Sequence, residues 1–355
     1  MLRRFGRFNL ELGLRAAFSM AVPLFVLLAL GRLELAPYAI CGAFTALYGR
    51  NEPYRLRFRS VTVGGLALVS SIGLGISAAV AGEQLWLVTV LLLMVVGCGV
   101  MITAIWDLIP AQPLFLVFGL LVSARIPTTP ADVPLRLIIA CASAALCWLV
   151  TMSGWVVRRV LLHWNVQPET NAILIKKLYR IPAVDAAAFR DARVWLTVVQ
   201  NLLSVCVAGA LALSFGLGHP YWAIITVVAA IPPPRAAHSI SRSLHRTAGT
   251  VAGVIVAFVF LTWAPPLVLI VSAIVVCQFC AQILIGISYG WSMVFITPLA
   301  LSVTFLAGTA RLESLVVDRV IETVLGAAVA IVFVLLARVV THRFFVIDVS
   351  ESSRH

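Results

Sequence analysis

Apolar runs follow one another along almost the whole chain, and short polar segments separate them. A helix needs roughly 20 apolar residues to cross the hydrocarbon core of a bilayer. The pattern therefore predicts an all-α polytopic membrane protein with about twelve transmembrane helices, half of them in each half of the chain. The predicted spans are 12–31, 35–49, 60–81, 85–106, 108–124, 135–157, 194–216, 220–234, 247–264, 266–285, 288–308 and 317–340.

Two predicted spans, 35–49 and 220–234, are short and contain proline. The prolines at 232–234 cannot continue a helix, so nearby carbonyl groups lose their hydrogen-bond partners. In a membrane such groups must face protein or a watery cavity. We therefore expect both spans to be tilted, broken or incompletely spanning, as segments close to a substrate path are in transporters.

Three markers recur at a constant spacing of 183 positions, each at the edge of a predicted span. A repeat in an apolar chain is typical of a membrane protein with two similar halves and a path or pocket between them. An even number of spans in each half puts both copies the same way up. The recurring markers are Pro37-Tyr38 and Pro220-Tyr221, Arg59 and Arg242, and Arg136 and Arg319.

The predicted organisation therefore consists of two parallel six-helix repeats, at residues 1–157 and 194–343. A polar connector at 158–193 joins them, and a short tail follows at 344–355. Residues 171–180 in the connector have one apolar face at helical spacing, which predicts a short cytoplasmic or interfacial helix.

The composition excludes a soluble domain, because 62% of the residues are hydrophobic, only 11% are charged, and the mean hydropathy is +1.06. Soluble domains carry about 25% charged residues. The net charge of +12 comes from basic residues at span ends and not from a solvated basic domain, which argues against nucleic-acid binding. The first apolar run follows three arginines, as in a signal peptide, but the many later spans identify it as the first membrane helix.

The arginines also predict an orientation, because cytoplasmic loops carry an excess of basic residues. Alternate loops hold most of the arginines and both lysines, whereas the loops between them are sparse. We therefore predict a multi-pass protein of the cytoplasmic (inner) membrane with both termini inside. The basic segments are 3–7, 50–59, 158–177, 235–246 and 338–343.

No motif predicts catalysis, a metal or a cofactor. The seven cysteines lie in apolar runs, and the pair Cys277 and Cys280 has no second pair or histidine-rich segment to complete a metal site. Their residue type suits small apolar packing. The chain contains no P-loop, HExxH or GxSxG sequence, so neither ATP hydrolysis nor a membrane-embedded enzyme is expected.

The strongest local pattern lies between 219 and 253. It comprises Tyr221-Trp222-Ala223, Thr226, Pro232, Arg246-Thr-Ala-Gly249-Thr250 and Gly253, and a related pattern, Arg319-x-x-Glu322-Thr323-x-x-Gly326, opens the last span. This stretch resembles the fusaric acid resistance protein-like and aromatic acid exporter family. The first half carries a degraded version, since the tryptophan is missing after Tyr38. Larger members have a substantial soluble region after each set of six helices, and here only the connector and the tail stand in those places.

The resemblance implies export of small organic anions, with aromatic carboxylates as the expected substrates. Arg242, His245 and Arg246 share one face at the start of a span. A guanidinium group can bind a carboxylate through two parallel hydrogen bonds. The residues predicted for the substrate path are Arg59, Arg242, Arg246, Tyr38, Tyr221, Trp222 and His245. The arginines also fit a second interpretation, as topology determinants that meet anionic lipid, and the aromatic residues fit an interfacial belt.

Acidic groups inside a bilayer are costly and often mark ion or proton routes. Asp107, Asp318 and Glu322 are therefore the candidates for proton coupling, although Glu322 is also placed for a local ion pair with Arg319. Gly249 and Gly253 form a GxxxG pair that allows another helix to approach closely.

The function predicted from the sequence is thus export of organic anions driven by the proton gradient. A passive organic-anion channel and a membrane scaffold that transports nothing are the alternatives. The predicted partners are a small organic anion and the lipid bilayer, together with either a second copy of the chain or an accessory efflux protein.

Overall fold

The computed structural model describes residues 8–50, 52–163, 180–233, 240–306, 308 and 312–345. All regular structure in these residues is helical, and twelve α-helices lie within them. Nine of these helices are long and apolar enough to cross a membrane, and three apolar helical segments are shorter. The predicted all-α, polytopic membrane class is therefore confirmed.

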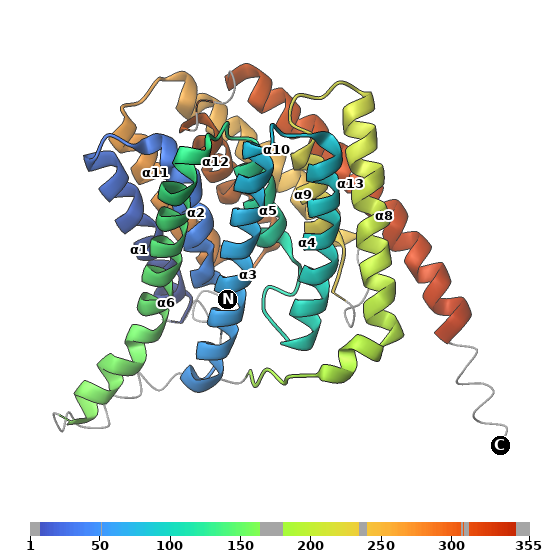
Figure 1. Ribbon diagram of the computed structural model, residues 1–355, viewed down its shortest axis with the longest axis horizontal. Coiled ribbons are helices and arrows are strands. Elements are labelled where there is room, and N and C mark those ends of the chain that lie inside the picture. Colours follow the sequence, from blue (N-terminus) through green and yellow to red (C-terminus); the bar gives the residue numbers. More distant parts are fainter. Residues whose placement is uncertain are drawn as a thin grey trace.

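The helices stand side by side in one bundle (Figure 1). Those of the first half are α1 (Phe8–Ala29), α2 (Ala36–Ala43), α3 (Tyr54–Val80), α4 (Leu85–Ile105), α5 (Leu114–Ala124) and α6 (Val133–His163). Those of the second half are α8 (Ala192–Ser214), α9 (Tyr221–Ala230), α10 (Ser241–Thr262), α11 (Leu267–Leu284), α12 (Tyr289–Leu306) and α13 (Leu312–Phe345). The 3₁₀ turns are η2 (Leu33–Leu35), η3 (Phe44–Leu47), η4 (Pro130–Asp132) and η5 (Ala186–Arg190).

Each predicted span overlaps one of these helices, but several helix starts differ from the prediction: α1, α3, α10 and α13 begin four to six residues earlier, and α5 begins six residues later. The span predicted at 108–124 becomes helical only at Leu114, because Pro110 and Pro113 come first and proline lacks the N–H group that a helix interior needs. α10 begins at Ser241, earlier than predicted, so that Arg242 and Arg246 lie inside its first turns. The helix predicted at 171–180 falls almost wholly outside the described residues, as do Pro234 and the tail.

Three short helices form the centre of the bundle. Every residue of α2 and of α9 is buried, and α5 packs against both helices. A helix of ten residues is about 15 Å long, half of the roughly 30 Å that the hydrocarbon core requires. The shortness of α2 and α9 matches the prediction for spans 35–49 and 220–234, whereas that of α5 was not predicted. Backbone that is interrupted at this depth is tolerated only inside protein or beside a cavity.

The principal helix contacts come in matching pairs. In the first half α3 packs on α5 and α2 on α6, and in the second half α10 packs on α12 and α9 on α13. The two halves meet where α1 lies against α11 and where α4 lies against α8 (Figure 1).

Glycines bring several of these helices into very close contact. A Cβ atom on Gly249 of α10 would lie 2.4 Å from the carbonyl oxygen of Gly290 at the start of α12, and one on Gly253 would lie 2.7 Å from the Cβ of Thr297. The GxxxG pair therefore does face a packed neighbour, and a side chain at either glycine would push α12 away.

Candidate functional site

A cavity of about 160 Å³ lies between the two halves, at the end of the bundle where α3 begins and α4 ends. We call it the lower cavity, since that end is at the bottom of Figure 1. Its wall includes four arginines and five aromatic residues, and no aspartate or glutamate is among its described lining residues. The arginines are Arg50, Arg242, Arg246 and Arg319, and the aromatic residues are Phe44, Phe115, Phe118, Trp222 and Tyr289.

Two of the arginines share one face of α10. The Nε atom of Arg242 donates a hydrogen bond to the carbonyl oxygen of Ala229, 2.8 Å away, and its guanidinium carbon lies 4.5 Å from the ring centroid of Tyr289. Arg242 therefore satisfies a carbonyl group in the last turn of α9, where the helix dipole favours a cation. Arg246 donates to the hydroxyl of Tyr289 at 3.1 Å. It is only 3% exposed, and its Nε atom has no hydrogen-bond partner among the residues that the structure describes.

Arg319 of α13 lies deepest in the lower cavity and is only 1% exposed. Its guanidinium carbon lies 3.7 Å from the ring centroid of Trp222, which is a close cation–π contact. The Nε and Nη1 atoms of Arg319 have no hydrogen-bond partner among the described residues. Leaving buried N–H groups unpaired costs free energy, and an acceptor brought by a ligand would remove that cost.

The arginine side chains are not neutralised within the cavity wall. Glu322 is one helical turn from Arg319, yet its Oε1 atom accepts from the backbone N–H of His219 at 2.9 Å and the structure shows no ion pair with Arg319. The local ion pair expected from the sequence is therefore wrong, because Glu322 is turned toward α9. The lower cavity consequently combines excess positive charge, unpaired guanidinium N–H groups and aromatic walls. A small planar anion has the matching chemistry.

The structure brings together only part of the predicted path: Arg242, Arg246 and Trp222. Arg59 lies outside the lower cavity, where it donates to the carbonyl oxygen of Pro182 at 2.9 Å and lies over the ring of Trp106. His245 pairs with Ser241 at 3.0 Å and does not line the cavity. The other two residues, Tyr38 and Tyr221, also lie elsewhere, the first against Arg136 and the second against another cavity.

The lining residues that were absent from the predicted path include Arg50, Tyr289 and Arg319. For two of these residues, Arg319 and Tyr289, the 183-position spacing in the sequence was a signal. Arg319 is one of the repeat markers, and Tyr289 follows Trp106 by the same 183 positions as the other pairs. Arg50 carries no such signal, because it lies in the turn between η3 and α3. Burial lowers the pKa of Arg50.

The acidic candidates divide into two groups. Asp318 and Glu322 lie close to His219 and do not line the lower cavity. The Nδ1 atom of His219 is 2.7 Å from a carboxylate oxygen of Asp318, and Glu322 is fully buried. Asp107 lies elsewhere and pairs with Arg180 of the connector at 2.8 Å. The same arginine also pairs with Glu52, whose pKa is raised by burial. Asp107 therefore fixes the connector to the first half and does not face the lower cavity.

A second cavity, of about 300 Å³, lies at the opposite end of the bundle between α4, α5, α8 and α9. We call it the upper cavity. Its wall is almost entirely apolar, and its charged lining residues are Glu83 and Arg125, whose side chains are 3.5 Å apart. Tyr221 and Cys206 also line it.

Comparison with known proteins agrees with the pattern seen in the sequence. Residues 206–333, just over a third of the chain, match the model of the fusaric acid resistance protein-like family. A curated relative, the uncharacterized membrane protein YvaC of Bacillus subtilis (strain 168), is 28% identical over 168 residues, which are 47% of this chain and 25% of that protein. The match thus spans a quarter of the relative's length. No solved structure matches the chain.

The matched residues contain α9, α10, α11 and α12 and much of α13, and they include Arg242, Arg246 and Arg319. The chain is thus a multi-pass membrane protein whose predicted resemblance to the fusaric acid resistance protein-like family is confirmed for residues 206–333.

Proposed function

We propose that this protein carries small organic anions out of the cell, with aromatic carboxylates as the substrate class. The observation that supports the proposal most is the lower cavity, in which Arg246 and Arg319 are almost fully buried and hold unpaired N–H groups beside aromatic rings. A carboxylate would accept hydrogen bonds from these guanidinium groups, and a ring would pack against Phe118 and Trp222.

The size of the lower cavity favours a small substrate. Pockets for drug-sized ligands enclose about 300–1,000 Å³, and this one encloses about 160 Å³. One aromatic ring with a carboxylate suits that volume better than a multi-ring compound does. The Arg-rich wall would also raise the local concentration of anions at the mouth, an effect that weakens with ionic strength.

We further propose that the two halves are six-helix repeats in parallel orientation. The matching helix pairs support this, since α3 with α5 corresponds to α10 with α12, and α2 with α6 corresponds to α9 with α13. The crossings of α1 onto α11 and of α8 onto α4 correspond in the same way. The lower cavity would then lie on the axis between the repeats, as substrate sites do in repeat-built transporters.

The arginine bias places the lower cavity on the cytoplasmic side of an inner-membrane protein. Cysteines introduced at Thr170 and Ser352 should then resist an impermeant thiol reagent in intact cells, while one at Thr128 should react. The reverse labelling would contradict the proposed orientation. The proton gradient would supply energy, with Asp318, Glu322 and His219 as the groups that exchange protons.

Anion binding to the purified protein tests the proposal directly. We expect benzoate to raise the thermal stability of the detergent-solubilised protein, and benzamide, which lacks the charge, to have no such effect. Replacing Arg246 with alanine should abolish the shift. Replacing the exposed Arg55, which is at the same end of the bundle but outside the lower cavity, should leave it intact.

Two outcomes would contradict organic-anion export. Absence of any stabilisation across aromatic, phenolic and aliphatic acids would favour a scaffold without transport. Currents in proteoliposomes that saturate weakly and do not respond to a pH gradient would favour a passive channel.

A further inference from the structure

The upper and lower cavities share two walls, the short helices α5 and α9. On α5, Phe115 and Phe118 face the lower cavity, whereas Leu121 and Ala124, one turn further along, face the upper cavity. On α9 the change occurs between neighbours: Trp222 and Ile225 line the lower cavity, and Tyr221 and Ile224 line the upper cavity. The two cavities therefore lie at the two ends of a single α5–α9 seam.

Aromatic side chains close this seam. The rings of Phe118 and Trp222 are 5.9 Å apart, centroid to centroid, and those of Trp222 and Tyr221 are 4.8 Å apart. Trp222 is 1% exposed, and its ring also lies on Arg319. The barrier between the two cavities is thus made of side chains on two half-length helices and not of a continuous helix.

We propose that the two cavities are the two ends of one path for the organic anion, and that the Phe118–Trp222 ring pair is the gate between them. This inference rests on the proposed function of the lower cavity. It adds a second site on the path, the upper cavity, which takes the apolar ring of the anion after the carboxylate has left Arg319.

The two cavities differ in charge, and the difference favours movement of an anion from the lower cavity to the upper cavity. The lower cavity has four arginines and no acidic lining residue among those described, whereas Arg125 in the upper cavity is accompanied by Glu83. An anion is therefore held strongly at the lower end and weakly at the upper end. Side-chain rotation and small shifts of short helices are also less costly than the displacement of a helix that crosses the whole membrane.

A native cysteine provides a reporter for the upper cavity. Cys206 of α8 lines that cavity and is exposed. In a protein that retains Cys206 as its sole cysteine, we expect benzoate to slow the reaction of this thiol with N-ethylmaleimide, as measured by mass spectrometry in lipid nanodiscs. Benzamide should have little effect, because it is not captured by the arginines of the lower cavity.

Gate variants give the second measurement. Phe118→Ala, and the milder Phe118→Leu in case the first is unstable, should raise the passive flux of benzoate across proteoliposomes severalfold while benzoate still stabilises the protein. Leu120→Ala is the matched control, since Leu120 is a buried residue of α5 that lines neither cavity, and its loss should not open a leak.

The outcomes separate this inference from the proposed function. If benzoate binds but neither protects Cys206 nor leaks through the Phe118 variants, the gate and the upper site are wrong while the lower site stands. A Cys206 that reacts readily in detergent but is protected in lipid nanodiscs, equally with and without benzoate, would identify the upper cavity as a lipid groove and would also overturn the inference. If benzoate does not bind at all, the proposed function itself fails.

Discussion

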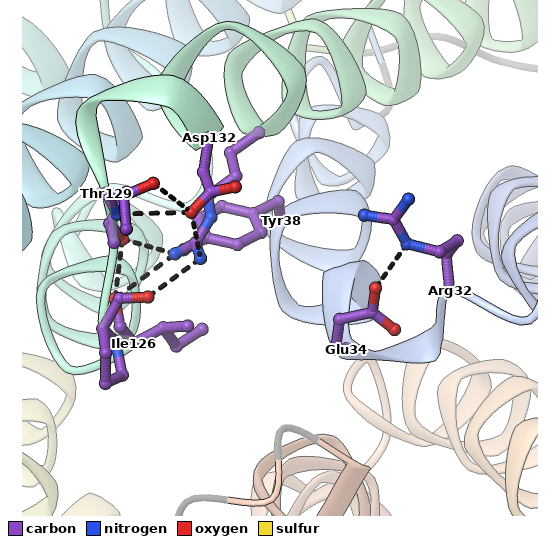
Figure 2. Close-up of polar contacts among 9 residues, drawn as sticks. Arg32, Glu34, Tyr38, Ile126, Thr129 and Asp132 are labelled. Atoms are coloured by element: carbon purple, nitrogen blue, oxygen red, sulfur yellow. Dashed lines mark hydrogen bonds and ion pairs between the residues drawn. The ribbon is translucent and has the colours of Figure 1, made fainter.

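Arg136 and Arg319 lie 183 positions apart, one in the first turns of α6 and the other in the first turns of α13, and their surroundings are very different. Arg136 donates to the hydroxyl of Tyr38 at 2.7 Å, to the carbonyl oxygen of Pro127 at 2.8 Å and to Thr128, and it pairs with Asp132 at 3.7 Å. In Figure 2, Tyr38 lies beside the Thr129–Asp132 contacts that cap the turn η4, immediately before α6. Arg319 instead lies on the ring of Trp222 with two nitrogens unpaired.

One substitution between the halves accounts for much of the difference. The position that corresponds to Trp222 is Ala39 in the first half, so no large ring separates Arg136 from Tyr38. In the second half the Trp222 ring covers the Arg319 guanidinium, and Tyr221 faces the upper cavity. The arginine of the first half is therefore held by hydrogen bonds within the fold, whereas the site that we propose needs Arg319 as a donor to the anion.

A second pair of arginines, Arg59 and Arg242, shows the same difference between the two halves. Arg59 over Trp106 corresponds to Arg242 over Tyr289, but only the second pair lines the lower cavity. Asp318 and Glu322, the acidic residues near Arg319, also have no acidic counterpart in the first half. The residues 183 positions before them are Leu135 and Ile139. Three of the four arginines that line the lower cavity therefore lie in the second half, within the residues that match the family model.

The largest effect on binding is expected from Arg319→Ala. A hydrogen bond to a charged group contributes about 1.5–3 kcal/mol, so the affinity for benzoate should fall by roughly 10- to 100-fold. Thermal stability should fall less than in Arg136→Ala, because the loss of the contact with Trp222 is partly offset by the removal of unpaired buried N–H groups. Isothermal titration calorimetry measures the change in affinity, and thermal unfolding measures the change in stability. A variant that binds benzoate normally would show that Arg319 is as structural as Arg136.

Arg136→Ala should mainly lower the stability of the protein and not its affinity for benzoate. Loss of its hydrogen bonds leaves the Tyr38 hydroxyl and backbone carbonyl groups without a donor, which should cost about 1–3 kcal/mol of stability. The affinity of the folded protein for benzoate should stay unchanged. Thermal unfolding of this variant beside Arg319→Ala is the measurement, and equal losses of stability in both would remove the distinction between the halves.

Much of the fold was readable from the sequence, and the reasons are visible in particular elements. Long apolar runs such as α4 and α11 have a length set by the bilayer, so periodicity and hydropathy located them. The late start of α5 was not predicted, although Pro110 and Pro113 indicate it in the sequence. The lower cavity was predicted only in part, because pattern reasoning grouped Arg59 with Arg242 and could not show that Arg319 lies on Trp222 in the same cavity wall.

Glu322→Gln tests whether the carboxylates of the second half add proton coupling to binding. Glutamine keeps an oxygen that can accept from the His219 N–H but cannot exchange a proton in the physiological range. Transport in proteoliposomes should therefore lose its dependence on an imposed pH gradient, while benzoate affinity at one pH changes little. Rates that follow the gradient as in the parent would remove Glu322 from the coupling route.

Arg246→Lys should have a more moderate effect. Lysine keeps the positive charge but loses the planar fork that binds both carboxylate oxygens, so affinity should fall severalfold, and by less than in Arg246→Ala. Calorimetry on the two variants gives the ratio. Equal affinities for the parent and the lysine variant would mean that Arg246 contributes only its charge, as a topology determinant would.

The smallest expected effect compares Tyr289 with Trp106 at the corresponding position. Tyr289→Phe keeps the ring under Arg242 but removes the hydroxyl that accepts from Arg246, so the guanidinium of Arg246 becomes less well oriented. One hydrogen bond of about 0.5–1.5 kcal/mol corresponds to a loss of affinity of roughly 2- to 10-fold. Trp106→Phe keeps a ring near Arg59 outside the lower cavity and should leave benzoate affinity unchanged. A loss of affinity in the Trp106 variant as large as that in the Tyr289 variant would show that both halves contribute to binding, and the division between them would have to be abandoned.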